Sequence, residues 1–157
     1  MKKFIDLIKE EDIFVPRNIE GRKEKIKQAL LKQLDQKVID GDVEIDCKLI
    51  PDNYIAKVEL INGDVHVKKC NSLKFFKQLK EVNGSFVCEG NKLTSLEGCP
   101  EIVQDNFWCN HNYLTSLKYC PKTVNGSFSC YNNKVELTVK DVEEYCDVKY
   151  NVLTHTI

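Results

Sequence analysis

Long apolar segments are missing from this sequence of 157 residues. No apolar run approaches the roughly 18 residues that a membrane-spanning helix needs, so we expect no membrane span. A net charge is also missing, because 23 Lys and Arg are balanced by 24 Asp and Glu. The whole molecule therefore has no field that would attract nucleic acid or anionic lipid. Met1 to Glu11 begins like a signal peptide, but Asp6 and Lys9 interrupt its apolar stretch, and we predict no secretion signal.

The sequence also lacks the motifs that carry common chemistries. It has no glycine-rich phosphate-binding loop, no Cys-x-x-Cys pair and no carboxylate pair at a catalytic spacing. Its three histidines, His66, His111 and His155, do not stand at a fixed spacing from a nucleophile and an acid. We therefore expect no enzymatic activity, no metal site and no cofactor.

The sequence does contain an internal repeat with a period of 21 residues. Three segments align without gaps, two further segments between them align with each other, and three weaker copies flank them: 82–91, 103–112 and 124–133; 92–100 and 113–121; 39–45, 61–67 and 147–150. A constant period of this length is typical of a solenoid, in which each repeat forms one coil. We predict five clear coils and a degraded sixth.

The dipeptide Asn-Gly, at Asn62, Asn83 and Asn125, leaves a second interpretation open. Asn-Gly before alternating apolar residues is also typical of a two-residue β-hairpin. A hairpin needs a partner strand directly before the turn, and 79–82 is a poor one, so the constant period favours the solenoid. The length is that of one domain, which we divide into an N-terminal helical cap (1–37) and a solenoid (38–157).

The repeated motif places Phe86, Cys88 and Asn91 before Leu-Thr-Ser-Leu and Cys-Pro, in the order Phe-x-Cys-x-x-Asn-x-Leu-Thr-Ser-Leu-x-x-Cys-Pro. It resembles a leucine-rich repeat, most closely the short repeats of bacterial effector-type proteins. The resemblance implies one short parallel strand per coil and a sheet that lines a concave face. It also implies an asparagine ladder, with side-chain amides bonded to the next coil: Asn91, Asn112 and Asn133, with Cys70 at the equivalent place one coil earlier. The first apolar residue of each copy, such as Val82, lies one position earlier than the family's usual spacing puts it.

Alternation along each strand sends every second side chain inward. The inward pairs are Val43 with Ile45, Val65 with Val67, Phe86 with Cys88, Phe107 with Cys109, and Phe128 with Cys130. The next apolar residues close the back of each coil: Leu93, Leu96 and Cys99, then Leu114, Leu117 and Cys120. Buried thiols behave as small apolar fillers, so we expect reduced cysteines, a reducing compartment and a cytoplasmic protein, in the host cytoplasm if a phage encodes it.

A solenoid must cover its open ends, and apolar residues at helical spacing predict a capping helix over 18–38 with Asn18 as N-cap. A shorter helix is predicted over 2–10. The helix at 18–38 carries a local excess of positive charge, at Arg22, Lys23, Lys25, Lys27 and Lys32. Such a patch is usually a solvated helix face, but it is the alternative site, for nucleic acid or a nucleotide. At the other end, Thr138 to Tyr145 departs from the repeat, as suits a terminal coil.

Outward strand positions are where a binding function would lie. The central outward row is expected to be Glu44, His66, Val87, Trp108, Ser129 and Lys149, and the next row Asp46, Lys68, Glu89, Asn110 and Tyr131. Trp108 is the only tryptophan, and a large aromatic that faces solvent in the middle of a row is typical of a binding hot spot. The opposing interpretation is that neighbouring side chains or the capping helix cover it.

We expect a non-catalytic module that docks a partner protein on this face through His66, Val87, Trp108, Asn110, Ser129 and Tyr131. Short single-domain proteins of this type in bacteria and their phages resemble inhibitors or adaptors, and such a role is inferred by analogy alone. Binding of nucleic acid through the basic helix is the alternative, and it requires a strong dependence on salt.

Overall fold

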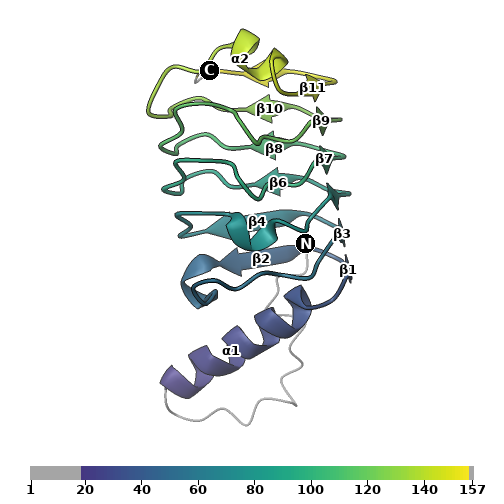
Figure 1. Ribbon diagram of the computed structural model, residues 1–157, viewed down its shortest axis with the longest axis vertical. Coiled ribbons are helices and arrows are strands. Elements are labelled where there is room, and N and C mark those ends of the chain that lie inside the picture. Colours follow the sequence, from purple (N-terminus) through teal and green to yellow (C-terminus); the bar gives the residue numbers. More distant parts are fainter. Residues whose placement is uncertain (1–18, 156–157) are drawn as a thin grey trace.

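The computed structural model describes residues 19–155 and is a β-solenoid of six coils built from two parallel sheets (Figure 1). Sheet A contains β1 (Val38–Asp40), β3 (Leu60–Asn62), β5 (Glu81–Val82), β7 (Ile102–Val103), β9 (Thr123–Val124) and β11 (Asp147–Val148). Sheet B contains β2 (Val43–Asp46), β4 (Val65–Lys68), β6 (Phe86–Val87), β8 (Phe107–Trp108), β10 (Phe128–Ser129) and β12 (Val152–Leu153). Neighbouring coils pair in register at the predicted period, for example Val82 with Val103 and Val103 with Val124.

The prediction of a repeat solenoid with parallel strands and an N-terminal helix is confirmed, but one strand per coil is wrong. Each coil has a second strand, in sheet A, directly before the corner that holds the Asn-Gly dipeptide. The hairpin interpretation is wrong as well, because the strands on either side of a corner belong to different sheets and pair with neighbouring coils. The early apolar residue, such as Val82, is explained by this extra strand, where its side chain is fully buried.

At Gly63 and Gly126 the backbones of successive coils approach each other closely. A Cβ atom on Gly63 would lie 2.4 Å from the carbonyl carbon of Gly41, and one on Gly126 would lie 2.6 Å from that of Asp105. A side chain would clash at such distances, so glycine is favoured at these two positions, although Asp105 occupies the equivalent corner position of the fourth coil. The close approach brings the flanking strands to pairing distance in both sheets.

The interior is filled by columns of identical or similar side chains, one from each coil. Phe86 lies 5.9 Å from Phe107 between ring centroids, and Phe107 lies 5.0 Å from Phe128. Phe76 closes the lower end of this column, 6.2 Å from Phe86. All four rings are fully buried, and each contributes about 1.5–3 kcal/mol through apolar burial. The inward residues predicted for the strands are therefore the core of the solenoid.

The asparagine ladder is present as the resemblance implied. The side-chain oxygen of Asn112 accepts a hydrogen bond from the Leu93 N–H at 3.0 Å, and its amide donates to the carbonyls of Cys88, Cys109 and Asn110 at 2.8–3.3 Å. Asn91 and Asn133 repeat these contacts one coil below and one coil above, Asn91 accepting from the Cys70 N–H and Asn133 from the Leu114 N–H. The ladder supplies partners to turn groups that are buried between coils.

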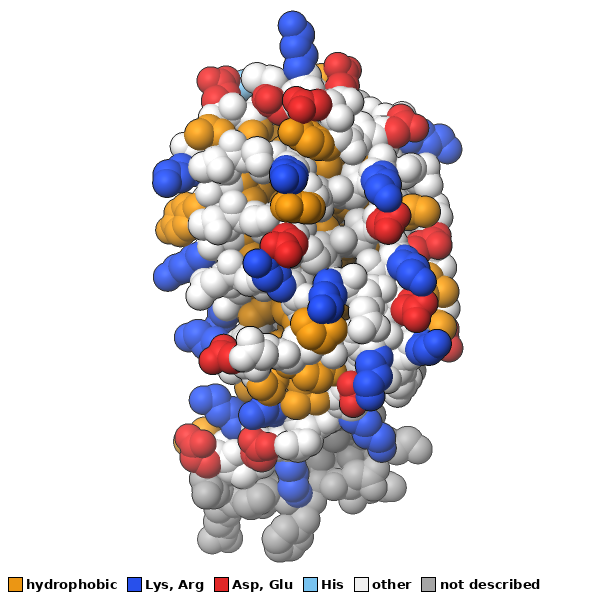
Figure 2. All heavy atoms as spheres, viewed as in Figure 1, with side chains coloured by type: hydrophobic (Ala, Val, Ile, Leu, Met, Phe, Trp, Pro, Cys, Tyr) orange, Lys and Arg blue, Asp and Glu red, His pale blue; other side chains and the backbone are white. Residues whose placement is uncertain are grey.

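An alternating column of charges runs along the loop that enters sheet A. Lys80 Nζ lies 2.9 Å from a Glu59 carboxylate oxygen, Lys122 lies 2.8 Å from Glu101, and Lys37 lies 3.9 Å from Glu59. Hydrogen bonding from their lysine partners lowers the pKa of both Glu59 and Glu101. These pairs are exposed, so each contributes little stability. Figure 2 shows cations and anions interspersed over one whole face of the molecule.

Both ends of the stack carry a helix. At the N-terminal end α1 (Ile19–Leu34) buries Leu30 and Leu34 in the core, and its last residues precede β1 directly. At the other end α2 (Val139–Glu143) begins with a capping box between Thr138 and Asp141 and buries Val142. This helix is the departure from the repeat that the sequence predicted for the last coil. The helix predicted over 2–10, the N-cap Asn18 and the start of the chain lie outside the described residues.

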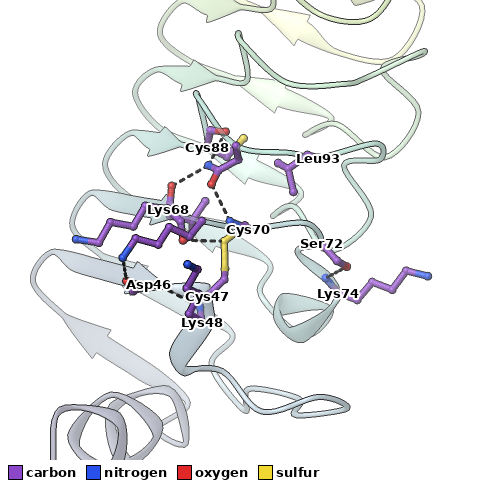
Figure 3. The surroundings of a disulfide bond; sticks show 12 residues. Asp46, Cys47, Lys48, Lys68, Cys70, Ser72, Lys74, Cys88 and Leu93 are labelled. Carbon is purple, nitrogen blue, oxygen red and sulfur yellow. Dashed lines mark hydrogen bonds and ion pairs between the residues drawn. A yellow bond between two sulfur atoms is a disulfide. The ribbon is translucent and has the colours of Figure 1, made fainter. Parts of the chain in front are cut away.

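The expectation that all the cysteines are reduced is wrong for one pair. Cys47 and Cys70 form a disulfide, with their Cα atoms 5.1 Å apart (Figure 3). The first coil carries a 3-10 helix, η3 (Cys47–Leu49), directly after β2, and this helix brings Cys47 against the ladder position that Cys70 occupies. Cys47 belongs to none of the predicted columns, so the repeat pattern did not point to it.

The other six cysteines are free thiols, as predicted. Burial raises the pKa of Cys88 and of Cys109, so both are neutral thiols at neutral pH. They fill the core behind the phenylalanine column. Disulfides persist mainly in oxidising compartments, whereas buried free thiols occur in proteins of either kind of compartment. The cytoplasmic localisation therefore stays a prediction.

Candidate protein-binding face

The outer face of sheet B is built by strand register. Phe86, Phe107 and Phe128 point into the core, so the residues that follow them point outward. The parallel pairing aligns these outward residues in one row across the sheet: Glu44, His66, Val87, Trp108, Ser129 and Leu153. The predicted row is thus correct up to Ser129 and wrong at its end, where Leu153 and not Lys149 is aligned, because the last coil, which contains α2, is longer than the 21-residue repeat.

Trp108 is the prominent side chain of this row, with 39% of its surface exposed. Val87 and Ser129 lie directly on either side of it in register, and they are only 9% and 3% exposed. Registered side chains on adjacent strands lie about 5 Å apart, so a bulky indole covers the smaller side chains beside it. Val87 and Ser129 therefore support Trp108 and offer little surface of their own, in contrast to the exposed row that the sequence suggested.

The second outward row is held by polar contacts within the sheet. Asn110 donates through its amide to a Glu89 carboxylate oxygen at 2.7 Å and is only 2% exposed. Tyr131 is partly buried, and its ring stands edge-on to His111 at 5.2 Å between centroids. Asn110, which we expected to contact a partner, is thus a buried structural residue. His111 in the coil of Trp108 is exposed, and Tyr131 in the next coil is partly exposed.

The lower part of the face is charged. Lys68 forms an ion pair with Glu44, and Lys69 forms one with Asp46. Although partial burial raises the pKa of Asp46, hydrogen bonds from Lys69 and from the Lys48 N–H lower it overall. His66 is partly buried between Glu44 and Val87. The face therefore has an apolar centre at Trp108 and a paired, charged rim at the first two coils.

The basic residues of the alternative site lie on α1 with their side chains outside the core. Arg22, Lys23, Lys25 and Lys32 are exposed, and Lys27 is partly buried. Glu20 and Glu24 lie on the same helix, and Glu24 accepts a hydrogen bond from Gln28. This helix is at the N-terminal end of the stack, away from Trp108 in the fourth coil (Figure 1). The two candidate surfaces are therefore separate and can be tested separately.

Other kinds of site have little support in the part of the chain that the structure describes. Across residues 19–155, no three His, Cys, Asp or Glu side chains gather where they could hold a metal ion. Within the same residues, no helix is long and apolar enough to cross a membrane. A groove beside Cys47 and Cys70 is the surface feature that sequence reasoning missed, and the only signal for it was a cysteine outside the repeat columns.

Comparison with known proteins adds no function to this geometry. No family model, no curated protein and no solved structure matches the chain. The architecture itself, a β-solenoid with a repeat of about 21 residues, is what the coordinates establish.

Proposed function

We propose that this protein is a non-catalytic binding module that docks a partner protein on the outer face of sheet B around Trp108. The observation that carries the proposal is the half-exposed position of the only tryptophan in the middle of a regular strand row. Tryptophan is among the residues most enriched at binding hot spots, where it packs into a partner.

The surroundings of Trp108 support this proposal. Val87 and Ser129 hold the indole from both sides, and backbone pairing fixes β8 between β6 and β10. A side chain held in this way loses little entropy on binding. Leu153 and Tyr131 add partly buried apolar surface nearby, and the paired charges at Lys68 and Glu44 form a polar rim. An apolar centre with a polar rim is the usual composition of a protein interface.

The finer parts of the proposal rest on the sequence resemblance. We include in it a relationship to short leucine-rich repeats, which the asparagine ladder at Asn91, Asn112 and Asn133 supports and the second strand of each coil does not. A cytoplasmic inhibitor or adaptor from a bacterium or its phage, working without a cofactor, is the role that this analogy favours.

The test is a comparison of Trp108→Ala with a matched aromatic variant, Tyr113→Ala. Tyr113 is 52% exposed and lies in the turn after the ladder, outside both sheets. Tagged wild type and both variants are used to capture proteins from bacterial lysate, and each captured protein is identified and titrated in purified form. Trp108 is also a direct probe, because its fluorescence emission shifts to shorter wavelength when a partner covers it.

The expected result is a partner whose affinity falls at least tenfold in Trp108→Ala and is unchanged in Tyr113→Ala, with equal melting temperatures for all three proteins. A partner that binds Trp108→Ala as tightly as wild type would overturn the proposal. If the captured material is removed by nuclease and by salt, α1 with Arg22, Lys23 and Lys25 is the working surface instead.

A further inference from the structure

A groove of about 980 Å³ opens beside the Cys47–Cys70 disulfide, and neither Trp108 nor its neighbours Val87 and Ser129 line it. Three segments from the first coils line it: 47–55, 69–75 and 90–92. The first segment contains η3, and the second leads into the 3-10 helix η4 (Lys74–Phe76). The repeat is least regular here, since later coils have Leu-Thr-Ser-Leu turns in place of these helices.

The lining of this groove carries more positive than negative charge. Four lysines line it, Lys48, Lys69, Lys74 and Lys92, against a single carboxylate, Asp52. Lys69 and Lys74 are paired with carboxylates at its edges, Asp46 and Glu97. Lys48 and Lys92 are exposed, and neither has an ion-pair partner among residues 19–155. Two lysines without an ion-pair partner in the described residues therefore line the same groove from different coils.

The rest of the lining is a mixture of apolar side chains and uncharged polar ones, among them Asn71 and Ser72. Ile50, Ile55 and Tyr54 are partly buried, and Phe75 is almost fully buried. The Tyr54 hydroxyl donates to Asp35 at 3.1 Å, so this wall is anchored on α1. Burial and the Asp35 carboxylate raise the pKa of Tyr54 to about 12, so it remains a neutral donor.

The walls of the groove are held in a fixed relation. The disulfide joins η3 on one wall to the turn after β4 on the other (Figure 3). Lys69 adopts a left-handed backbone conformation, with φ of 58°, at a position where the later coils have Gly90, His111 and Asn132 in the same conformation. Lysine is a less favourable residue than glycine or asparagine at such a position. A charged side chain is thus retained at the groove at a conformational cost.

We propose that this groove binds an extended acidic peptide segment of a partner protein, with carboxylates on Lys48 and Lys92 and an apolar side chain against Ile50 and Phe75. The charge of the lining selects an anionic ligand, and its apolar part selects a polypeptide over a phosphate ion. The surface is separate from the Trp108 face, so the inference does not depend on the proposed function.

A nucleic acid fits the same observations less well. Backbone phosphates would need a continuous basic path, whereas the lysines at the edges of the groove are already paired with Asp46 and Glu97. The formal charge of the whole chain is −1, which gives no long-range attraction for a polyanion. We therefore treat an oligonucleotide as the competing ligand in the test.

The experiment measures binding by fluorescence anisotropy with the full chain in its oxidised form. The probe is a fluorescein-labelled peptide, Gly-Glu-Glu-Leu-Glu-Glu-Gly, and its counterpart has lysine at each glutamate. The groove variant is Lys48→Glu with Lys92→Glu. The matched control is Lys134→Glu with Lys140→Glu, two exposed lysines outside the groove that give the same change in net charge.

We expect the acidic peptide to bind wild type and the control variant with affinities within twofold of each other, and the groove variant at least tenfold more weakly. Lys48→Gln with Lys92→Gln should lie between them, and Trp108→Ala should bind like wild type. The proposal is overturned if the lysine peptide binds as well as the acidic one, or if the groove variant binds like the control. It is also overturned if a single-stranded oligonucleotide binds more tightly than the peptide and loses its affinity in the groove variant.

Discussion

The asparagine ladder makes a quantitative prediction at Asn112. The variant Asn112→Ala removes four hydrogen bonds, one accepted from the Leu93 N–H and three donated to carbonyls. Each of the three carbonyls keeps a partner: that of Cys88 still accepts from Asn91, that of Cys109 from Asn133, and that of Asn110 from the Gly90 N–H. The Leu93 N–H alone is left buried without a partner.

These contacts give the expected magnitude. A buried donor without a partner costs about 1–3 kcal/mol, and the loss of a bond to a carbonyl that remains bonded costs about 0.5 kcal/mol. We therefore expect Asn112→Ala to lower the free energy of unfolding by about 3 kcal/mol. The matched control is Asn125→Ala, whose amide makes one bond, to the Gln104 side chain at an exposed corner, and which should cost less than about 1 kcal/mol.

The assay is equilibrium unfolding in urea, followed by circular dichroism, for wild type and both variants. Hydrogen exchange adds a local readout, because the Leu93 amide should lose protection in Asn112→Ala and keep it in Asn125→Ala. The reasoning is refuted if the two variants are equally stable, or if Asn112→Ala is destabilised while the Leu93 amide exchanges as in wild type.

Three further predictions concern the disulfide, the charge column and the core. Reduction of the Cys47–Cys70 bond, whose cysteines are 23 residues apart, should lower the free energy of unfolding by about 3 kcal/mol through loop entropy, and a Cys47→Ser variant should no longer respond to reductant in urea unfolding. The pKa values of Glu59 and Glu101 are lowered in the fold, so their stabilisation is present above their ordinary pKa and disappears as pH falls through the lowered one. Thermal melts below about pH 4.5 should therefore show a smaller acid destabilisation in Glu59→Gln with Glu101→Gln, and equal pH profiles would contradict this. Phe107→Ala should cost about 3–5 kcal/mol in urea unfolding because its ring is fully buried between two others, and a cost below about 1.5 kcal/mol would mean that the column collapses around the gap.

The period, the coil number and the core columns could be read from the sequence because a solenoid repeats its contacts as it repeats its residues. Phe86, Phe107 and Phe128 occupy one position of the repeat and one column of the core. The ladder at Asn91 and Asn112 was expected from the resemblance to leucine-rich repeats. The strands of sheet A were not predicted, because each contributes a single repeated buried apolar residue, such as Val82, and one such residue per coil does not distinguish a strand from a turn.

For the candidate face, the sequence predicted which side chains align across sheet B, but it did not predict how much of each side chain is exposed. Trp108 does face outward, but the burial of Val87, Ser129 and Asn110 depends on the size of the side chains beside them in space. Leu153 replaced Lys149 in the row because α2 lengthens the last coil. Neither the burial of these side chains nor the shift of the last coil can be predicted from the position of a residue within the repeat.

Taken by itself, the sequence determined that this protein is a stack of similar coils, because a repeated apolar pattern can be buried only by stacking each copy on the next. Only the tertiary structure decided that each coil turns through two sheets, that Cys47 meets Cys70, and that four lysines share one groove. These features depend on where irregular segments cross between coils. Cys47, for example, lies outside the repeated columns, so its contact with Cys70 exists only once η3 packs against the next coil.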